Sequence, residues 1–133
     1  MTASCCIASG LLLLAFSLGA PAAPPAANHG ERTQLSRHDL SIPGYEEIQM
    51  RVGLKPGEVA ARHRHPGEEI IYVTAGTIRY DLDGQPAQTL HAGNVLFVPT
   101  GTIHSATNVG TTDAAEIGTY IVPKGKPLVE WMP

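Results

Sequence analysis

The residues best suited to chemistry in this sequence are three histidines and one glutamate: His63, His65, His104 and Glu69. Three neutral imidazoles and a carboxylate are donors that a divalent transition metal such as zinc, iron, copper, nickel or manganese accepts. No cysteine stands near them to complete a tetrahedral structural zinc site, so such a set can leave coordination positions open for water, oxygen or a substrate. The residue types therefore predict a site for a divalent transition metal, and they say less about the substrate.

The identity of the metal would decide the chemistry of such a site. A redox-active iron or copper that is six-coordinate keeps two adjacent positions beside four protein ligands, which suits a dioxygenase reaction on a catechol-like or enediol substrate. A zinc ion would act instead as a Lewis acid in isomerisation, elimination or hydrolysis. A non-catalytic module that binds a small ligand or sequesters metal stays open as an alternative, although an intact ligand set favours an enzyme.

The spacing of the four residues predicts how strands would carry them. His63 and His65 are two positions apart, so on an extended strand both imidazoles leave from the same face. Pro66-Gly67 then allows a bend, and Glu69 begins a returning strand from which its carboxylate can approach the same point. His104 follows much later, so only the fold can bring it to the others. An H-x-H pair alone is more often a solvated surface feature, and it is the joint pattern that argues for a metal.

The elements around these residues read as short β-strands joined by tight turns. From 48 to 54, apolar residues alternate with polar or small ones, the period of two that a half-buried strand has. Asp83-Gly84 is a hairpin signal. Further strands are predicted at 70–73, 77–82, 95–98 and 114–122. Because no long segment has a helical period, the pattern predicts an antiparallel sandwich or barrel without a βαβ unit.

Two segments resemble the paired motifs of the cupin superfamily. Residues 57–76, GEVAARHRHPGEEIIYVTAG, match the first motif, G(x5)HxH(x3–4)E(x6)G, and residues 93–108, GNVLFVPTGTIHSATN, match the second, G(x5)PxG(x2)H(x3)N. The short spacing between them resembles that of small single-domain bacterial cupins of the type-2 kind. The resemblance implies an all-β fold, a small antiparallel jelly-roll β-barrel in a single domain, with a metal inside its mouth.

The same resemblance implies roles for individual residues. The three histidines and Glu69 would be the metal ligands, with Glu68 as the alternative carboxylate, although Glu68 would shorten the motif spacing by one residue. Asn108 would be a motif residue that is structural more often than ligating. Small cupins commonly associate through exposed strand edges, so a homodimer is expected.

A family resemblance does not carry over a reaction, because cupins include dioxygenases, isomerases, decarboxylases, lyases and non-catalytic binding proteins. By family frequency we expect an exported metal-binding cupin that acts as a dioxygenase-like enzyme on a small organic molecule. The alternatives are a metal-dependent isomerase or lyase, and a non-catalytic module that binds a small ligand or metal.

Weaker candidates for a substrate-binding role are Arg51, Tyr72 and Arg79, with Tyr80 and Gln49 beside them. These side chains could line the pocket and orient an anionic or hydroxylated substrate, although a solvent-facing or packing position is the commoner role for each. Histidines outside the motifs carry no ligand prediction, and Trp131 is expected only to help cover a sheet edge. The histidines concerned are His29, His38 and His91.

The ends of the chain differ in composition from its middle. Residues 1–27 carry an apolar run followed by small residues and prolines, which predicts a secretory signal peptide and an exported protein, periplasmic or secreted. An uncleaved anchor is the alternative; once the segment is removed, no stable membrane span and no thiol would remain, since Cys5 and Cys6 both lie in it. Residues 28–45 are expected to form a polar leader with one short strand, 46–123 the barrel, and 124–133 a tail.

The charge pattern bears on partners and on metal loading. The formal net charge of −3 comes without any basic run, so nucleic acid is not an expected partner, and a small molecule is. No arginine precedes Arg32, so there is no twin-arginine signal and the chain would cross the membrane unfolded. Metal would then be loaded outside the cytoplasm, where the affinity order favours zinc or copper over manganese and iron.

Overall fold

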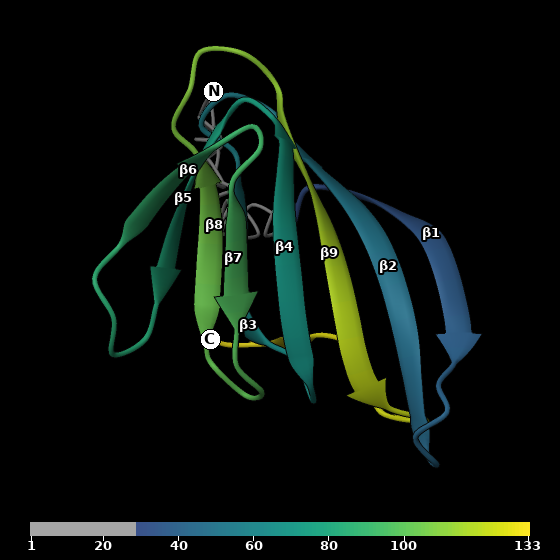
Figure 1. Cartoon of the computed structure of the whole chain (residues 1–133). Coiled ribbons are helices and arrows are strands. Elements are labelled where there is room, and N and C mark those ends of the chain that lie inside the picture. The colour runs from purple at the N-terminus through teal and green to yellow at the C-terminus, as the bar shows by residue number, and fades with distance from the viewer. Residues whose placement is uncertain (1–28) are drawn as a thin grey trace, which may run out of the picture.

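The computed structural model describes residues 29–133, and all regular elements of this part of the chain are β-strands (Figure 1). Within it we find no helix with the length and apolar character that crossing a membrane requires. The predicted signal peptide at 1–27 lies outside the described residues. The strands are β1 (Glu31–Asp39), β2 (Tyr45–Leu54), β3 (Val59–Arg64), β4 (Glu68–Ala75), β5 (Thr77–Leu82), β6 (Gln88–His91), β7 (Val95–Val98), β8 (His104–Asn108), β9 (Ala114–Pro123) and β10 (Glu130–Trp131).

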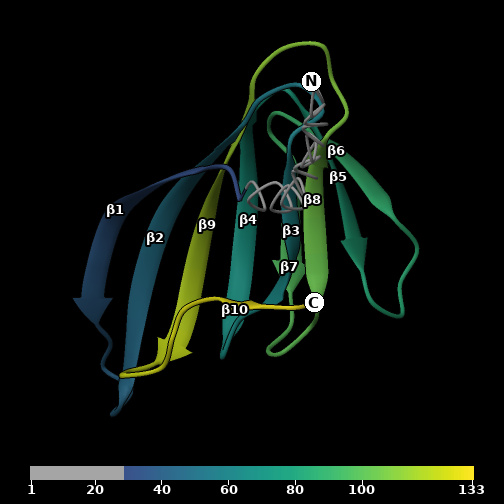
Figure 2. The ribbon, with the colours of Figure 1, turned by 180° about the vertical axis from the view of Figure 1, so that it is seen from behind.

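The ten strands form two five-stranded antiparallel sheets. One sheet has the order β1-β2-β9-β4-β7 and the other β10-β3-β8-β5-β6 (Figures 1 and 2). Neighbours in each sheet are mostly distant in sequence, as β9 between β2 and β4 illustrates, so the chain passes repeatedly from one sheet to the other. This is the all-β, antiparallel jelly-roll architecture in a single domain that the sequence predicts.

The core fills the space between the two sheets because alternate residues of each strand point inward. Ile71 and Val73 of β4 pack in one cluster with Ile78, Tyr80 and Leu82 of β5. A smaller cluster of Ile48, Tyr120 and Val122, with Met50 and Leu128 packed against it, lies in the sheet of β2 and β9. Burying each large apolar side chain contributes roughly 1.5–3 kcal/mol, so the first cluster, which has members from both sheets, holds the sheets together.

An irregularity in β3 decides which face carries its histidines. Ala60 pairs with Ala106 of β8, but the next pair is His63 with His104, so three steps on β3 match two on β8. This extra residue changes which positions of the strand point inward, from even-numbered to odd-numbered ones. Ala60 is buried, Arg62 is exposed, and His63 and His65 are buried. Without this bulge, the alternation set by Ala60 would direct both imidazoles to solvent.

The two ends of the described chain take part in the sheets more than their composition indicates. The region 28–45, expected to hold one short strand, contains the nine-residue β1, which pairs along β2 as the edge of the first sheet. In the tail at 124–133, the short strand β10 pairs with β3, where Trp131 is opposite His63. The tail thus covers the edge of β3, beside the predicted ligands (Figure 2).

Candidate metal centre

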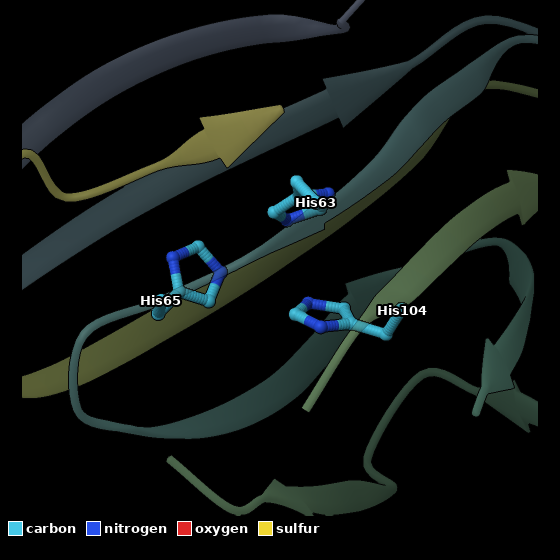
Figure 3. Close-up of side chains that lie close together, drawn as sticks. All are labelled: His63, His65 and His104. Carbon is cyan, nitrogen blue, oxygen red and sulfur yellow. The ribbon is translucent and has the colours of Figure 1, made fainter. Parts of the chain in front are cut away.

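The fold brings the three motif histidines together inside the barrel. The ligand nitrogens of His63, His65 and His104 all lie within 4.8 Å of one another, and each side chain is buried. His63 comes from β3, His65 follows directly after that strand, and His104 begins β8, which pairs with β3 (Figure 3). Residues 41 positions apart in the chain thus meet because β3 and β8 are neighbours in the sheet.

Glu69 reaches the imidazoles from the opposite sheet. Its Oε2 atom lies 3.3 Å from His65 Nε2 and 3.2 Å from His104 Nε2, and its side chain is 2% exposed. Glu68, the alternative carboxylate, is exposed because its neighbour in β4 takes the inward position. The bend that returns the chain from His65 passes close against β9: a Cβ atom on Gly67 would lie 2.0 Å from the carbonyl oxygen of Ile121. Only glycine allows this approach.

Backbone carbonyls orient all three imidazoles. His63 Nδ1 lies 2.7 Å from the carbonyl oxygen of Ala61, and His104 Nδ1 lies 2.9 Å from that of Thr102. His65 Nδ1 lies 2.7 Å from the carbonyl oxygen of Leu128, in the C-terminal tail. A carbonyl only accepts, so each Nδ1 must donate a proton, which leaves the Nε2 lone pair of a neutral imidazole free to bind a metal.

The protonation states of His63 and Glu69 are those that metal binding requires, and that of His104 depends on Glu69. Burial lowers the pKa of His63 to about 3, and the charge of His104 acts in the same direction. Burial opposes protonation of His104 too, but the polar contact and negative charge of Glu69 outweigh it and raise the pKa of His104. Burial alone would raise the pKa of Glu69, yet the contacts and charges of His104 and His65 hold it well below its usual range. The cluster therefore holds a neutral His63 and an ionised Glu69, and Glu69 favours protonation of His104, in competition with a metal.

These residues fit a divalent transition metal. Among the described residues, His65 Nε2 and Glu69 Oε2 are buried without a hydrogen-bond partner, which is costly unless another group satisfies them. Two adjacent ligands about 2.1 Å from one ion stand about 3 Å apart, close to the distances from Glu69 Oε2 to the two imidazoles. His63, His65, His104 and Glu69 would hold the ion, as the motif spacing predicts.

The wall next to Glu69 is polar, and the sequence prediction did not identify its most important residues. Glu69 pairs in register with Tyr120 of β9, whose pKa is raised well above its usual value by burial and by the neighbouring Glu69 carboxylate. Two residues before it, a Cβ atom on Gly118 would lie 2.6 Å from the Tyr120 hydroxyl and 2.7 Å from Glu69 Oε1. The glycine thus leaves the space in which the hydroxyl and the carboxylate meet.

A second buried carboxylate, Glu116, lies further along the same face of β9. Tyr80 of β5 donates a hydrogen bond to it across the barrel. Burial and the charge of Glu69 raise the pKa of Glu116 to about 7, against the opposing effects of Tyr80 and Arg32. Tyr80, one of the weaker candidates for lining the pocket, therefore points inward, and Glu116 is its hydrogen-bond partner.

Asn108 has the structural role that the motif implies. Its Nδ2 atom donates to the carbonyl oxygens of Leu54 and Thr112, at 2.9 and 2.8 Å, and its Oδ1 atom accepts from the backbone of Gly110 at 2.9 Å. The amide therefore ties β8 to the loop that follows it and to the end of β2. All these contacts are to backbone, so the side chain organises the loop at the end of β8.

The three predicted substrate-binding residues lie away from the imidazoles. Arg51, Tyr72 and Arg79 are exposed and alternate with inward-facing neighbours on β2, β4 and β5. Arg79 forms an ion pair with Asp81, and Arg51 lines a surface cleft that contains none of the four ligand residues. The alternation along each strand directs all three side chains to the outer surface, so they do not line a pocket beside the imidazoles.

The mouth near His63 is covered by residues from both ends of the described chain. The ring centroids of Trp131 and His63 are 5.0 Å apart, and His29 stacks on Trp131 at 3.6 Å. The guanidinium carbon of Arg32 lies 5.5 Å from the centre of the Trp131 ring. These residues lie outside both motifs and carry no predicted ligand or pocket role. His91 stands apart, exposed on β6 and in contact with Thr77, and His38 is exposed on β1.

Comparison with known sequences gives one family match and several partial relatives. The profile of the Cupin domain matches residues 50–123. Protein SchB of Streptomyces halstedii is 40% identical over 62 residues, which are 46% of this chain and 44% of that protein. The Oxalate-binding protein of Thermotoga maritima is 34% identical over 73 residues, 54% of this chain and 60% of that protein. The matched stretch thus spans less than two thirds of either relative.

Comparison with solved structures supports the same fold. A double-stranded β-helix protein from Klebsiella pneumoniae has a TM-score of 0.62 at 20% identity, with 80% of this chain and 90% of that chain covered. An oxalate oxidase in complex with the substrate analogue glycolate also has a TM-score of 0.62, at 22% identity, covering 82% and 58%. At these identities the likeness concerns the fold alone.

Proposed function

The chain belongs to the cupin family, and on this premise we propose that it is an exported metal-binding protein that acts as a metal-dependent enzyme on a small organic molecule. One observation carries the proposal: three buried imidazoles, each oriented by a backbone carbonyl, direct their ligand nitrogens at one point beside a buried carboxylate. Four ligands of this kind leave positions for a small oxygen donor.

The chemistry we favour is oxidative. A bound iron or copper ion would supply redox chemistry with oxygen, and a bound zinc ion would supply Lewis acidity. The chain's own residues would then orient the ligands through the carbonyls of Ala61, Thr102 and Leu128, and keep water from the inner core. Polar groups on the wall, the Tyr120 hydroxyl and the Glu116 carboxyl, favour catalysis over a metal enclosed by apolar side chains.

The test of this proposal has two steps. Elemental analysis of the purified protein identifies the metal, and an oxygen electrode then screens small organic acids, catechols and enediols with the iron- or copper-loaded protein. Oxygen uptake that depends on substrate and is abolished by His104→Ala supports the oxidative enzyme. A redox-inert native metal together with no uptake would contradict it and favour the isomerase or lyase alternative.

A non-catalytic binding role is the second candidate. The relative from Thermotoga maritima is named for binding oxalate, and its match covers 54% of this chain. Titration calorimetry with oxalate and the metal-loaded protein distinguishes the two candidates when it is combined with product analysis. Tight binding with oxalate recovered unchanged after prolonged incubation in air supports the binding module.

Export and its consequence for the metal belong to the same proposal. If the chain crosses the membrane unfolded, the site is loaded outside the cytoplasm, and zinc or copper is the expected native metal. Metal analysis of protein isolated from the native extracytoplasmic compartment tests this. Full occupancy by manganese would contradict it.

We also propose a homodimer, for which the outer face of β4 and β7 gives support. Two cross-strand pairs there are apolar and exposed: Ile70 with Phe97, and Tyr72 with Val95. A contiguous exposed apolar face of this kind is typical of an interaction surface. Light scattering should report twice the chain mass, and Phe97→Glu should reduce it to the mass of the single chain; a wild-type protein of single-chain mass at high concentration would contradict the dimer.

A further inference from the structure

Arg32 is a charged residue near the candidate metal centre. Among the described residues, no carboxylate is in hydrogen-bond contact with it. Its Nε and Nη1 atoms are buried and have no hydrogen-bond partner among residues 29–133. A buried guanidinium without a partner is costly, because it loses its hydration and gains no ion pair. The face of Trp131, 5.5 Å from the guanidinium carbon, offers a cation–π contact but no acceptor for these N–H groups.

The strand register places Arg32 on the inner face of its sheet. Arg32 of β1 pairs with Val52 of β2, and Val52 pairs with Glu116 of β9, so all three side chains emerge on the same face. Val52 is 1% exposed and Glu116 6%, which identifies this face as the interior. Arg32 therefore points into the barrel, unlike Arg51 and Arg79 on the outside.

Three observations connect Arg32 with the ligand cluster. Trp131 is close to both Arg32 and His63: the guanidinium carbon lies 5.5 Å from its ring centre, and the ring centroids of Trp131 and His63 are 5.0 Å apart. The positive charge of Arg32 acts on Tyr120, and the Tyr120 hydroxyl meets Glu69 above Gly118. Glu116 also lies within the electrostatic reach of Arg32, but it accepts its hydrogen bond from Tyr80. The guanidinium thus lies near the wall of the ligand cluster and has unused donors.

From this placement we propose that Arg32 is a recognition residue for the anionic group of a small carboxylate that binds at the metal centre. The inference rests on the proposed function and deepens it by giving the charge of the substrate or ligand. A guanidinium suits this task because its planar N–H groups match the two oxygens of a carboxylate. An oxygen atom of the same small molecule would bind the metal that the three histidines and Glu69 would hold, while its carboxylate would satisfy the buried Nε and Nη1 donors.

The binding experiment uses the full chain loaded with Zn²⁺ and oxalate as the probe, in wild type, Arg32→Gln, Arg32→Lys and Arg62→Gln. Arg62 is the matched control because it is an exposed arginine of β3 beside His63, in an ion pair with Asp83. We expect Arg32→Gln to weaken oxalate binding tenfold or more, Arg32→Lys to restore part of it, and Arg62→Gln to bind within threefold of wild type. The Zn²⁺ affinity should stay within threefold in all four proteins.

Trp131, the single tryptophan of the chain, offers an independent readout. Because Arg32 lies over its ring, oxalate binding should change the Trp131 fluorescence in wild type and not in Arg32→Gln. Thermal melting confirms that the variants are folded, and Arg32→Lys keeps the test decisive if Arg32→Gln does not fold. Equal oxalate affinity in wild type and a folded Arg32 variant would overturn the inference, as would an equal loss in Arg62→Gln. Failure of the wild type to bind Zn²⁺ would instead contradict the proposed function.

Discussion

His65 Nδ1 lies 2.7 Å from the backbone carbonyl oxygen of Leu128, so the C-terminal tail orients one of the three imidazoles. The tail is therefore part of the metal centre as well as a cover for the edge of β3. Outer partners of this kind fix the tautomer and the ring orientation of a ligand, and their loss typically costs 10- to 100-fold in metal affinity.

Removal of the tail tests this relationship. We predict that deleting residues 127–133 weakens metal binding by roughly tenfold or more, because His65 loses its acceptor. Deleting only 132–133 keeps Leu128 and Trp131 and should have little effect. Competition titration with a chromogenic zinc chelator measures both, with circular dichroism as the check on folding. Equal affinity of the two truncated proteins would show that the carbonyl does not support the site.

Gly118 provides a test from inside the barrel. We predict that Gly118→Ala weakens metal binding by roughly tenfold, since the new Cβ atom would stand 2.7 Å from Glu69 Oε1 and 2.6 Å from the Tyr120 hydroxyl, and one of them must move. Gly53→Ala is the control, because its Cβ atom would meet no neighbour closer than 3.4 Å. The same chelator titration applies. An unchanged affinity in Gly118→Ala would mean that neither group is held for the metal.

The pKa of His104 predicts the pH dependence of metal binding. Glu69 raises this pKa above the ordinary histidine value of about 6.5, so protons compete with the metal for His104 as the pH falls. The affinity should therefore fall by up to tenfold per pH unit below roughly pH 6. His63 adds no competition until much lower pH, because its pKa is about 3. Affinity that stays level down to pH 4 would show that the histidines are not the ligands.

Glu116 predicts a pH effect on the stability of the metal-free protein. Its folded-state pKa of about 7 lies above the ordinary 4.5, so its contribution to stability is complete below pH 4.5 and is lost as the pH rises through 7. Glu116→Gln keeps an acceptor for Tyr80 and has no charge to bury. Its advantage over wild type should grow by about 3 kcal/mol between pH 4.5 and pH 8, as measured by urea unfolding. A difference that does not change with pH would contradict an ionisable Glu116 in this environment.

The candidate ligands and the fold could be predicted because both depend on spacing. The two-residue interval of His63 and His65 and the second motif place three imidazoles at the neighbouring strands β3 and β8, and the bend at Gly67 brings Glu69 to them from the opposite sheet. The inward direction of His63 also depends on the bulge after Ala60, for which the sequence carries no clear signal.

What could not be predicted depends on backbone atoms or on strands that are apolar on both faces. The carbonyl of Leu128 has no sequence signature. Residues 70–73 are apolar throughout, which hides that Tyr72 faces outward. The polar composition of 28–45 concealed that Arg32 belongs to a strand with one face turned to the interior. Alternation with Val52 does indicate that Arg51 faces outward, and that signal could have been used.

The central claim is most directly tested by the metal content of the purified protein after saturation with a divalent transition metal and removal of the excess. We predict about one ion per chain in wild type and in His91→Ala, whose imidazole is exposed and distant from the cluster, and nearly none in His63→Ala and His104→Ala. Inductively coupled plasma mass spectrometry gives the ratio of metal to protein. Full occupancy in folded His104→Ala, or none in wild type, would contradict the account.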